Sequence, residues 1–235
     1  MHLFYSTDLK NNTTTLTLSE EESHHFNVLR IADDEEVSVT NGKGLLCKAH
    51  MLHKTKREVL LSVFDCQQQQ LSRRICLAVA PTKGNDRFDW LLEKATEVGV
   101  TDILPVYTHY TERKKINTQR IEKRLIAATK QSMRTFVPQV ADLQKLEVFF
   151  RTLLPNVQKL IAHCKQESLP LLSEIVEPQQ DVLTLIGPEG GFSDEEILLA
   201  KQYGFDEVSL SENRLRTETA AITAVMMMKT GGQCK

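Results

Sequence analysis

Short continuous runs of apolar residues alternate with helix-like segments over residues 73–235, and this alternation limits the folds open to the chain. The runs lack the polar–apolar alternation of a half-exposed strand, so each is expected to be a strand buried on both faces. Such strands pair in parallel and are covered by helices on both faces of the sheet. The sequence therefore predicts an α/β domain here. The expected strands span residues 75–80, 103–107, 159–164, 182–186 and 208–210, and the expected helices 87–98, 116–133, 193–203 and 218–229.

Residues 1–72 predict a different architecture, a small barrel-like β domain with one helix. The helix is expected to begin at Ser19, where Ser19 and Glu22 match a capping box. Asn41-Gly42 is a turn signal between strands. The polar run Gln67–Gln70 is interpreted as the linker to the second domain, residues 73–235. The expected strands span residues 1–5, 36–40, 44–51 and 58–64.

The net charge and the amino-acid composition limit the kinds of partner that this protein can bind. The net charge is −2, and residues 1–72 hold 7 basic and 10 acidic side chains, so any nucleic acid must use a local basic patch. No apolar run approaches the roughly 20 residues of a membrane span, and the first residues do not resemble a signal peptide. The 5 cysteines are scattered without a CxxC pair, which predicts reduced thiols and no zinc or other metal site. The protein is therefore expected in the cytoplasm, away from membranes.

The sequence LIGPEGGFS, residues 185–193, joins an apolar run directly to a capped helix. Glycines let a backbone approach a ligand closely and adopt positive φ. Ligands of open α/β sheets bind at the carboxyl ends of the strands, where this loop is expected. A tight turn without any ligand explains the same residues equally well. The loop is neither GxGxxG nor a Walker loop.

A second loop, residues 210–217, also joins a strand to a helix and is dense in polar and charged groups. Thr217 is a plausible N-cap, and Glu218 would lie in the first turn, where the helix dipole favours an anion. Capping accounts for these two residues. It does not account for Arg214 and Arg216 at the same strand end.

Seven features, in order along the chain, are HHFNVLR at 24–30, Lys83, EKATEVGV at 93–100, TER at 111–113, QSMR at 131–134 followed by Pro138, GPEGGFS at 187–193, and LRTETA at 215–220. Together they resemble the RNA small-subunit methyltransferase E family, the uridine-N3 methyltransferases of 16S ribosomal RNA in the SPOUT superfamily. The resemblance covers nearly the whole chain.

The resemblance implies a PUA-like β-barrel at residues 1–72 and a SPOUT-type parallel sheet with a deep trefoil knot at residues 73–235. It also implies a homodimer that methylates N3 of a uridine in small-subunit RNA, with S-adenosylmethionine as donor and S-adenosylhomocysteine as product. The implied substrate is either the naked RNA or the assembled small subunit, and the sequence does not distinguish between them. The residues expected at the cofactor are His163, Leu185, Ile186, Gly187, Glu189, Gly190, Gly191, Leu210, Ser211, Asn213 and Leu215.

Methyl transfer to uridine N3 requires the N3 proton to leave, so a base or a cation that stabilises the anion is needed. Arg216 is the expected cation, and Glu218 or Glu189 the expected base. Tyr107 and Phe136 could stack on the target base, although core packing accounts for both. The RNA contacts implied by the family motifs are Arg30, Lys83, Arg113, Arg134 and Arg216.

Two positions depart from the family pattern: Ser211 stands where glycine is usual, and Lys130 where glutamate is more frequent. Three alternatives remain. The first is a knotted methyltransferase with another RNA target or a ribose 2′-hydroxyl target. The second is a non-catalytic RNA-binding protein, against which the retained Gly187, Gly190 and Gly191 argue. The third is a dinucleotide oxidoreductase, disfavoured because GxGxxG is absent.

Overall fold

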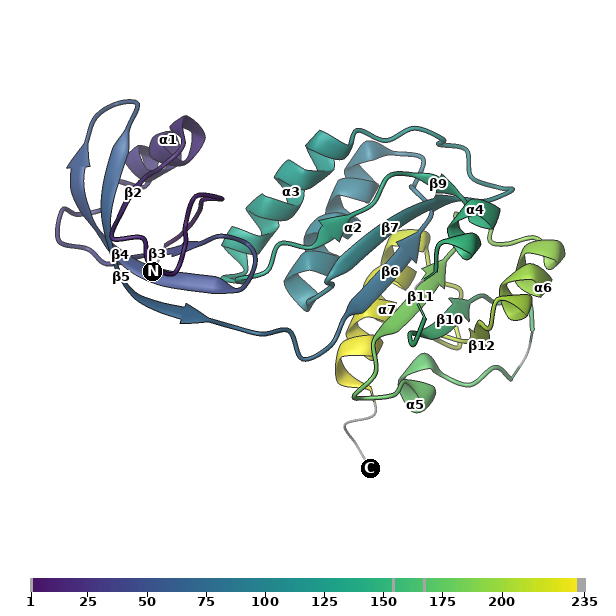
Figure 1. Cartoon of the computed structure of the whole chain (residues 1–235). Helices are drawn as coiled ribbons and strands as arrows, with labels where there is room; N and C mark the ends of the chain where they lie inside the picture. Colours follow the sequence, from purple (N-terminus) through teal and green to yellow (C-terminus); the bar gives the residue numbers. More distant parts are fainter. Residues whose placement is uncertain (1, 154, 167, 232–235) are drawn as a thin grey trace. The chain divides into compact units, whose positions relative to one another are not determined.

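The computed structural model describes residues 2–153, 155–166 and 168–231. Met1 of the first expected strand, Gly232 after the last expected helix, and Cys234 lie outside these ranges. The chain divides into two compact units (Figure 1). The first comprises Met1–Leu71 and Ile126–Val137, and the second Ser72–Leu125 and Pro138–Lys235.

The first unit is built on a five-stranded sheet in the order β1-β3-β4-β5-β2. The β1–β3 pair is parallel and the other pairs are antiparallel. Phe4, Phe26 and Leu61 lie in its buried core. The short β2 lies in a polar stretch with little apolar signal. The elements are β1 (Leu3–Tyr5), β2 (Thr15–Thr17), α1 (Glu20–Leu29), β3 (Val37–Thr40), β4 (Leu45–Lys54) and β5 (Val59–Gln68).

Helix α1 is capped as expected at Ser19, whose hydroxyl accepts the Glu22 backbone N–H at 3.2 Å. The reciprocal half of the predicted capping box does not form. The buried Glu22 carboxylate instead accepts the Tyr5 N–H at 3.1 Å and pairs with Lys130. A carboxylate removed from water requires such partners, because a lone backbone N–H compensates little of its desolvation. Lys130, a departure from the family pattern, is thus the counterion of Glu22.

Residues 126–137 return to the first unit after the chain has entered the second. The Thr135 carbonyl accepts hydrogen bonds from the Thr40 hydroxyl at 3.1 Å and from the Gly44 N–H at 2.9 Å. The predicted division between residues 72 and 73 does not include this return, because contacts between residues so far apart along the chain leave no local signal in the sequence. The predicted domain limits, residues 1–72 and 73–235, stay a prediction.

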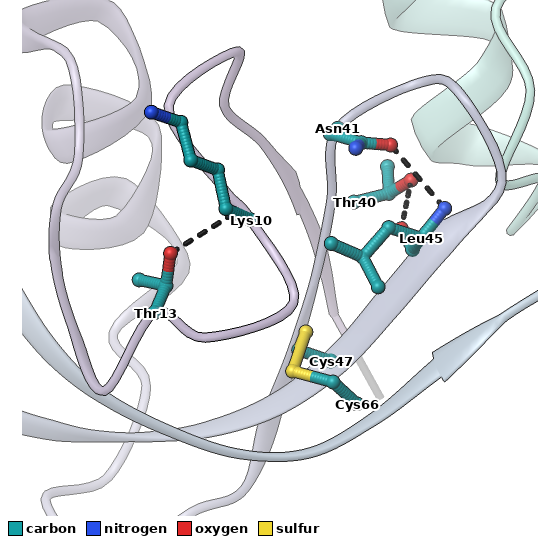
Figure 2. The surroundings of a disulfide bond; sticks show 7 residues. All are labelled: Lys10, Thr13, Thr40, Asn41, Leu45, Cys47 and Cys66. Atoms are coloured by element: carbon teal, nitrogen blue, oxygen red, sulfur yellow. Dashed lines mark hydrogen bonds between the residues drawn. A yellow bond between two sulfur atoms is a disulfide. The ribbon is translucent and has the colours of Figure 1, made fainter.

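One expectation for the first unit is wrong, and the bounds of another have to be changed. Cys47 and Cys66 form a disulfide, although the sequence predicts reduced thiols (Figure 2). The two residues face one another across β4 and β5, a proximity that their separation of 19 residues does not reveal. The polar run expected as a linker also begins inside the sheet, since β5 extends through Gln68 and the Gln69 N–H donates to Gly44 O at 2.8 Å. Exposed polar side chains do not prevent backbone pairing.

The second unit contains a parallel sheet in the order β12-β10-β11-β6-β7-β8, with β9 also paired to β7. Helices α4 and α6 pack on one face, and α7 packs on the other and against α2 (Figure 1). The deep trefoil knot stays a prediction. The elements are β6 (Ile75–Val79), α2 (Asn85–Val98), β7 (Asp102–Tyr107), α3 (Thr118–Gln131), β8 (Gln139–Val140), β9 (Gln144–Lys145), α4 (Leu146–Arg151), β10 (Gln158–Ala162), α5 (Leu172–Ile175), β11 (Val182–Ile186), α6 (Asp194–Gln202), β12 (Asp206–Val208) and α7 (Thr217–Thr230).

The helix ends of this unit test the capping predictions. The capping box of Ser193 and Glu196 forms in both directions at the start of α6. At α7 the expected N-cap is wrong, because Arg216 occupies that position and Thr217 is the first helical residue. Strand β12 ends at Val208, two residues before the end of the expected strand. The next N–H along the chain, that of Ser209, donates to Pro170 O at 2.9 Å. Within the described ranges, no helix has the length and apolar character to cross a bilayer.

Candidate active site at the ends of three parallel strands

A pocket of about 540 Å³ opens at the carboxyl ends of β10, β11 and β12. This volume lies within the range of small-molecule sites. Three loops meet there, together with the start of α7. The first follows β10 at residues 163–165, the second is the glycine loop at residues 187–191, and the third, at residues 210–217, follows β12. The residues lining the pocket are Ala162, His163, Cys164, Lys165, Ile186, Gly187, Pro188, Glu189, Gly190, Gly191, Phe192, Leu210, Ser211, Asn213, Arg214, Leu215, Arg216, Thr217 and Ala220.

All the expected cofactor residues line this pocket except Leu185. Leu185 is fully buried among the side chains that face α4 and α6. Successive side chains of a strand point to opposite faces, so the neighbouring Ile186 reaches the pocket and Leu185 does not. The apolar wall is therefore formed by Ile186, Leu210 and Leu215.

The glycine loop packs so closely against Tyr110 and Phe192 that side chains at two of its glycines would crowd these residues. A Cβ on Gly190 would lie 2.8 Å from Tyr110 Cβ, and one on Gly187 would lie 3.1 Å from the Phe192 ring. Gly191 has a φ of +73°, which favours glycine. The Thr217 hydroxyl donates to Gly187 O at 3.2 Å and holds the loop against α7. These glycines have structural reasons to be retained, so on their own they do not argue against a non-catalytic protein.

The third loop is ordered by serine hydroxyls. Ser209 Oγ donates to Ser211 O at 3.0 Å, and Ser211 Oγ accepts the Asn213 N–H at 3.1 Å. The φ angle of Ser211 is not positive, so its backbone accommodates a side chain where the family usually has glycine. Arg214 then reaches back to donate to Glu189 O at 3.3 Å, which ties the third loop to the glycine loop.

The three catalytic candidates occupy different environments. Arg216 and Glu189 are exposed on the pocket wall, and Glu189 Oε1 accepts the Lys83 N–H at 3.4 Å. Glu218 is buried in the first turn of α7 and is not part of the wall. Its Oε2 atom has no hydrogen-bond partner among the described residues. The pocket thus presents a carboxylate and a guanidinium together, with Glu218 behind them.

The five candidate RNA contacts lie on both units. In the first unit, Arg30 is exposed at the end of α1, whereas Arg134 is half-buried and burial lowers the pKa of its guanidinium. In the second unit, Lys83 pairs with Glu112 at 2.9 Å. Burial also lowers the pKa of Arg113, whose Cζ lies 5.6 Å from the centre of the Phe88 ring.

Tyr107 and Phe136, the aromatic residues considered for stacking on the target base, are less exposed than Tyr110, which the sequence did not single out. Tyr107 is half-buried beneath Lys114, and Phe136 packs against Gly44. Tyr110 is 48% exposed and packs against Gly190, which lines the pocket. Sequence reasoning also missed Lys165 and Ala220. Ala220 lies one helical turn from Thr217, so its position on the expected helix carried a spacing signal. Lys165 lies in a loop, where no such periodicity applies.

Comparisons with known proteins agree with this architecture. An RNA methyltransferase domain model matches residues 69–229, and an RNA methyltransferase PUA domain model matches residues 18–64. The ribosomal RNA small subunit methyltransferase E of Aquifex aeolicus is 31% identical, over 97% of this chain and 99% of that protein.

Two solved structures are also similar. A probable rRNA-methyltransferase from Porphyromonas gingivalis superposes with a TM-score of 0.90 at 32% identity, covering 100% of this chain and 99% of that one. The ribosomal RNA small subunit methyltransferase E of Neisseria gonorrhoeae, bound to S-adenosyl methionine, has a TM-score of 0.87 at 28% identity, covering 98% and 97%. The domain models match both expected units in order, and the relatives match along the whole chain. The chain therefore belongs to the ribosomal RNA small subunit methyltransferase E family.

Proposed function

We propose that this protein is an S-adenosylmethionine-dependent enzyme that methylates N3 of a uridine in 16S ribosomal RNA. Family membership supports the RNA substrate, and the relative from N. gonorrhoeae binds the same methyl donor. The single observation that carries the proposal is the pocket formed by the three strand-end loops. Because ribosomal RNA is the proposed substrate, we expect the enzyme to act in the cytoplasm. The family resemblance also implies that it is a homodimer.

The pocket residues fit the cofactor. Ile186, Leu210 and Leu215 offer an apolar surface for an adenine ring, and the glycine loop exposes backbone groups within reach of the polar parts. When bound, S-adenosylmethionine supplies a methyl group already activated by its sulfonium. The protein therefore has mainly to position the nucleophile and remove its proton.

The charged groups on the pocket wall suit that task. Glu189 accepts the N3 proton in our proposal, and Arg216 stabilises the negative charge that then develops on the uracil ring. Glu189 is better placed than Glu218, because it lines the pocket and Glu218 does not. Tyr110, which is exposed and packs against Gly190 of the pocket, offers a ring on which the target base can stack.

Cofactor binding is tested first by calorimetric titration with S-adenosylmethionine. Ala220 lines the pocket from α7, so Ala220→Trp fills it without changing a glycine. Ala127→Trp, at an exposed position of α3, is the matched control. Binding by the wild type and the control, lost in Ala220→Trp, supports the site. Binding that survives Ala220→Trp contradicts the assignment of this pocket.

The reaction is tested by methyl transfer to purified 16S RNA and to assembled small subunits, followed by nucleoside mass spectrometry. We expect 3-methyluridine, and a 2′-O-methyl nucleoside or no product would contradict the proposal.

Arg216→Ala should lower kcat by about 10²–10³-fold with little change in cofactor affinity. Glu189→Gln should abolish the pH dependence of kcat, whereas Glu218→Gln should retain it. Tyr110→Ala should raise KM for RNA while Tyr110→Phe does not.

A further inference from the structure

His163 is the one imidazole among the described residues that line the pocket, and both of its ring nitrogens are engaged. Nε2 lies 3.1 Å from Glu207 Oε1 on β12, and Nδ1 accepts the backbone N–H of Lys165 at 3.3 Å. Its side chain is only 4% exposed. The ring is therefore held from two directions.

These partners determine the tautomer. A backbone N–H is always a donor, so Nδ1 must carry a lone pair to accept it. Nε2 then carries the proton and donates it to the Glu207 carboxylate. Protonation of the imidazole would place a second hydrogen on Nδ1, facing the Lys165 N–H, and would break that hydrogen bond.

The charges around the ring are those of Glu207 on β12, Lys201 on α6 and Lys165 on the loop. Burial lowers the pKa of His163, an effect that Glu207 opposes and the two lysines reinforce. Lys201 also pairs with Glu207 and, by its hydrogen bond, lowers the pKa of that carboxyl. Glu207 is thus ionised and His163 neutral at pH 7.

The same loop is anchored at its other end. Lys165 Nζ lies 2.6 Å from Asp194 Oδ1, at the first residue of α6. The His163 N–H also donates to Val208 O at 3.3 Å. Residues 163–165 are therefore tied to β12 on one side and to α6 on the other, and they form one wall of the pocket.

We propose that His163, held by Glu207 as the neutral Nε2–H tautomer, is a positioning residue that keeps residues 163–165 in the shape required for cofactor binding. The inference rests on the proposed function, since it assumes that this pocket takes the methyl donor. Protonation of His163 releases Lys165 from Nδ1 and so disorganises the wall.

The sign of the pH effect follows from the lowered pKa of His163. The neutral ring is present above this pKa, so cofactor affinity is retained at pH 7 and lost as the pH falls through it. We expect the Kd for S-adenosylmethionine to rise by up to about tenfold between pH 7.5 and 5.5.

Two variants separate the two ring nitrogens. His163→Asn places an amide oxygen near the position of Nδ1 and can still accept the Lys165 N–H, whereas His163→Gln extends toward Glu207 instead. Calorimetric titrations across this pH range should give near wild-type affinity without pH dependence for His163→Asn. His163→Gln should bind weakly at every pH. Melting temperatures of both variants report whether they fold.

Nitrogen-15 spectra of the wild-type imidazoles, assigned with His163→Asn, provide a readout that needs no cofactor. The Nε2–H tautomer at pH 7, with a pKa below 6.5, supports the inference. The Nδ1–H tautomer, or binding equally strong from pH 7.5 to 5.5, overturns it and leaves the proposed function intact. A wild type that binds no S-adenosylmethionine at any pH overturns both.

Discussion

At the scale of single residues, two free cysteines of the second unit differ in their exposure to solvent. Cys164 is exposed on the pocket wall between His163 and Lys165. Cys76 is buried in β6, and burial followed by the nearby Asp102 raises its pKa to about 12. Only a thiolate reacts rapidly with alkylating agents, so the two thiols should be distinguishable in the folded protein.

We therefore predict that iodoacetamide at pH 8 labels Cys164 and leaves Cys76 unmodified until the protein is unfolded. Bound S-adenosylmethionine should slow the labelling of Cys164 several-fold. Peptide mass spectrometry measures each site separately, which also keeps Cys234 out of the comparison. Rapid labelling of Cys76 would contradict the burial of this side chain, and labelling of Cys164 unchanged by cofactor would contradict the position of the pocket.

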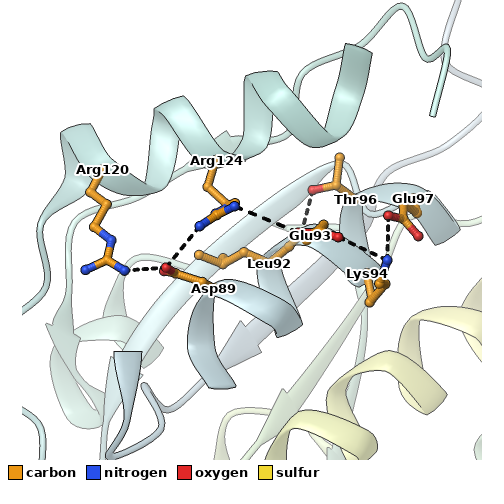
Figure 3. Close-up of polar contacts among 8 residues, drawn as sticks. All are labelled: Asp89, Leu92, Glu93, Lys94, Thr96, Glu97, Arg120 and Arg124. Carbon is orange, nitrogen blue, oxygen red and sulfur yellow. Dashed lines mark hydrogen bonds and ion pairs between the residues drawn. The ribbon is translucent and has the colours of Figure 1, made fainter. Parts of the chain in front are cut away.

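At the scale of elements, α2 and α3 are joined by a buried carboxylate. Asp89 on α2 pairs with Arg120 and, at 3.4 Å, with Arg124 on α3 (Figure 3). The Asp89 side chain is 12% exposed, whereas the Glu93 side chain nearby is 36% exposed and lies 3.9 Å from Arg124. Hydrogen-bonded charges that are largely shielded from water contribute more than exposed ion pairs do.

Asp89→Ala should thus lower the free energy of unfolding by about 1–3 kcal/mol, because it leaves two arginines without their shared partner. Glu93→Ala, the matched control on the same helix, should change it by less than about 1 kcal/mol. Urea denaturation with an unchanged slope would measure both. Equal losses in the two variants would show that the position of Asp89 has no special role.

At the scale of the whole molecule, the disulfide and the pocket belong to different units. Cys47 and Cys66 pair within the first unit, and every residue of the pocket lies in the second. A covalent link across 19 residues restricts the unfolded chain of the first unit only. Its loss should therefore change stability without changing cofactor binding.

We expect a reductant to lower the unfolding free energy of the first unit by roughly 2–4 kcal/mol, the usual range for such a loop. S-adenosylmethionine affinity should be unchanged. The double variant Cys47→Ser with Cys66→Ser should respond to the reductant no further. If alkylation of the native protein without reductant labels Cys47 and Cys66, the pairing itself is disproved.

Local patterns predicted most of the second unit. The strand β11 and the capping box at Ser193 follow from residues adjacent in the sequence, because burial on both faces and N-cap hydrogen bonds leave short-range signatures. Ten of the eleven expected cofactor residues meet in one pocket for a related reason: loops after parallel strands emerge at the same edge. Their roles in binding stay predictions.

Other features had no local signature. The Glu22 carboxylate turns to Tyr5 and Lys130 instead of to its own helix, and the Thr217 hydroxyl turns to Gly187 instead of capping α7. In both cases a partner distant along the chain competes with the local one. Short elements such as β8 and β9, of two residues each, exist only because a neighbouring strand is there to pair with.

The parallel sheet, the glycine loop and the family could be predicted from the sequence, because a buried strand or a family motif is a short run of residues that can be recognised without its neighbours in space. The folded structure was needed to show that Ile186 and not Leu185 reaches the pocket, that Cys47 pairs with Cys66, and that His163 is held between Glu207 and Lys165. These outcomes depend on which segments become neighbours in space, and spatial proximity between distant segments is set by the packing of the whole chain.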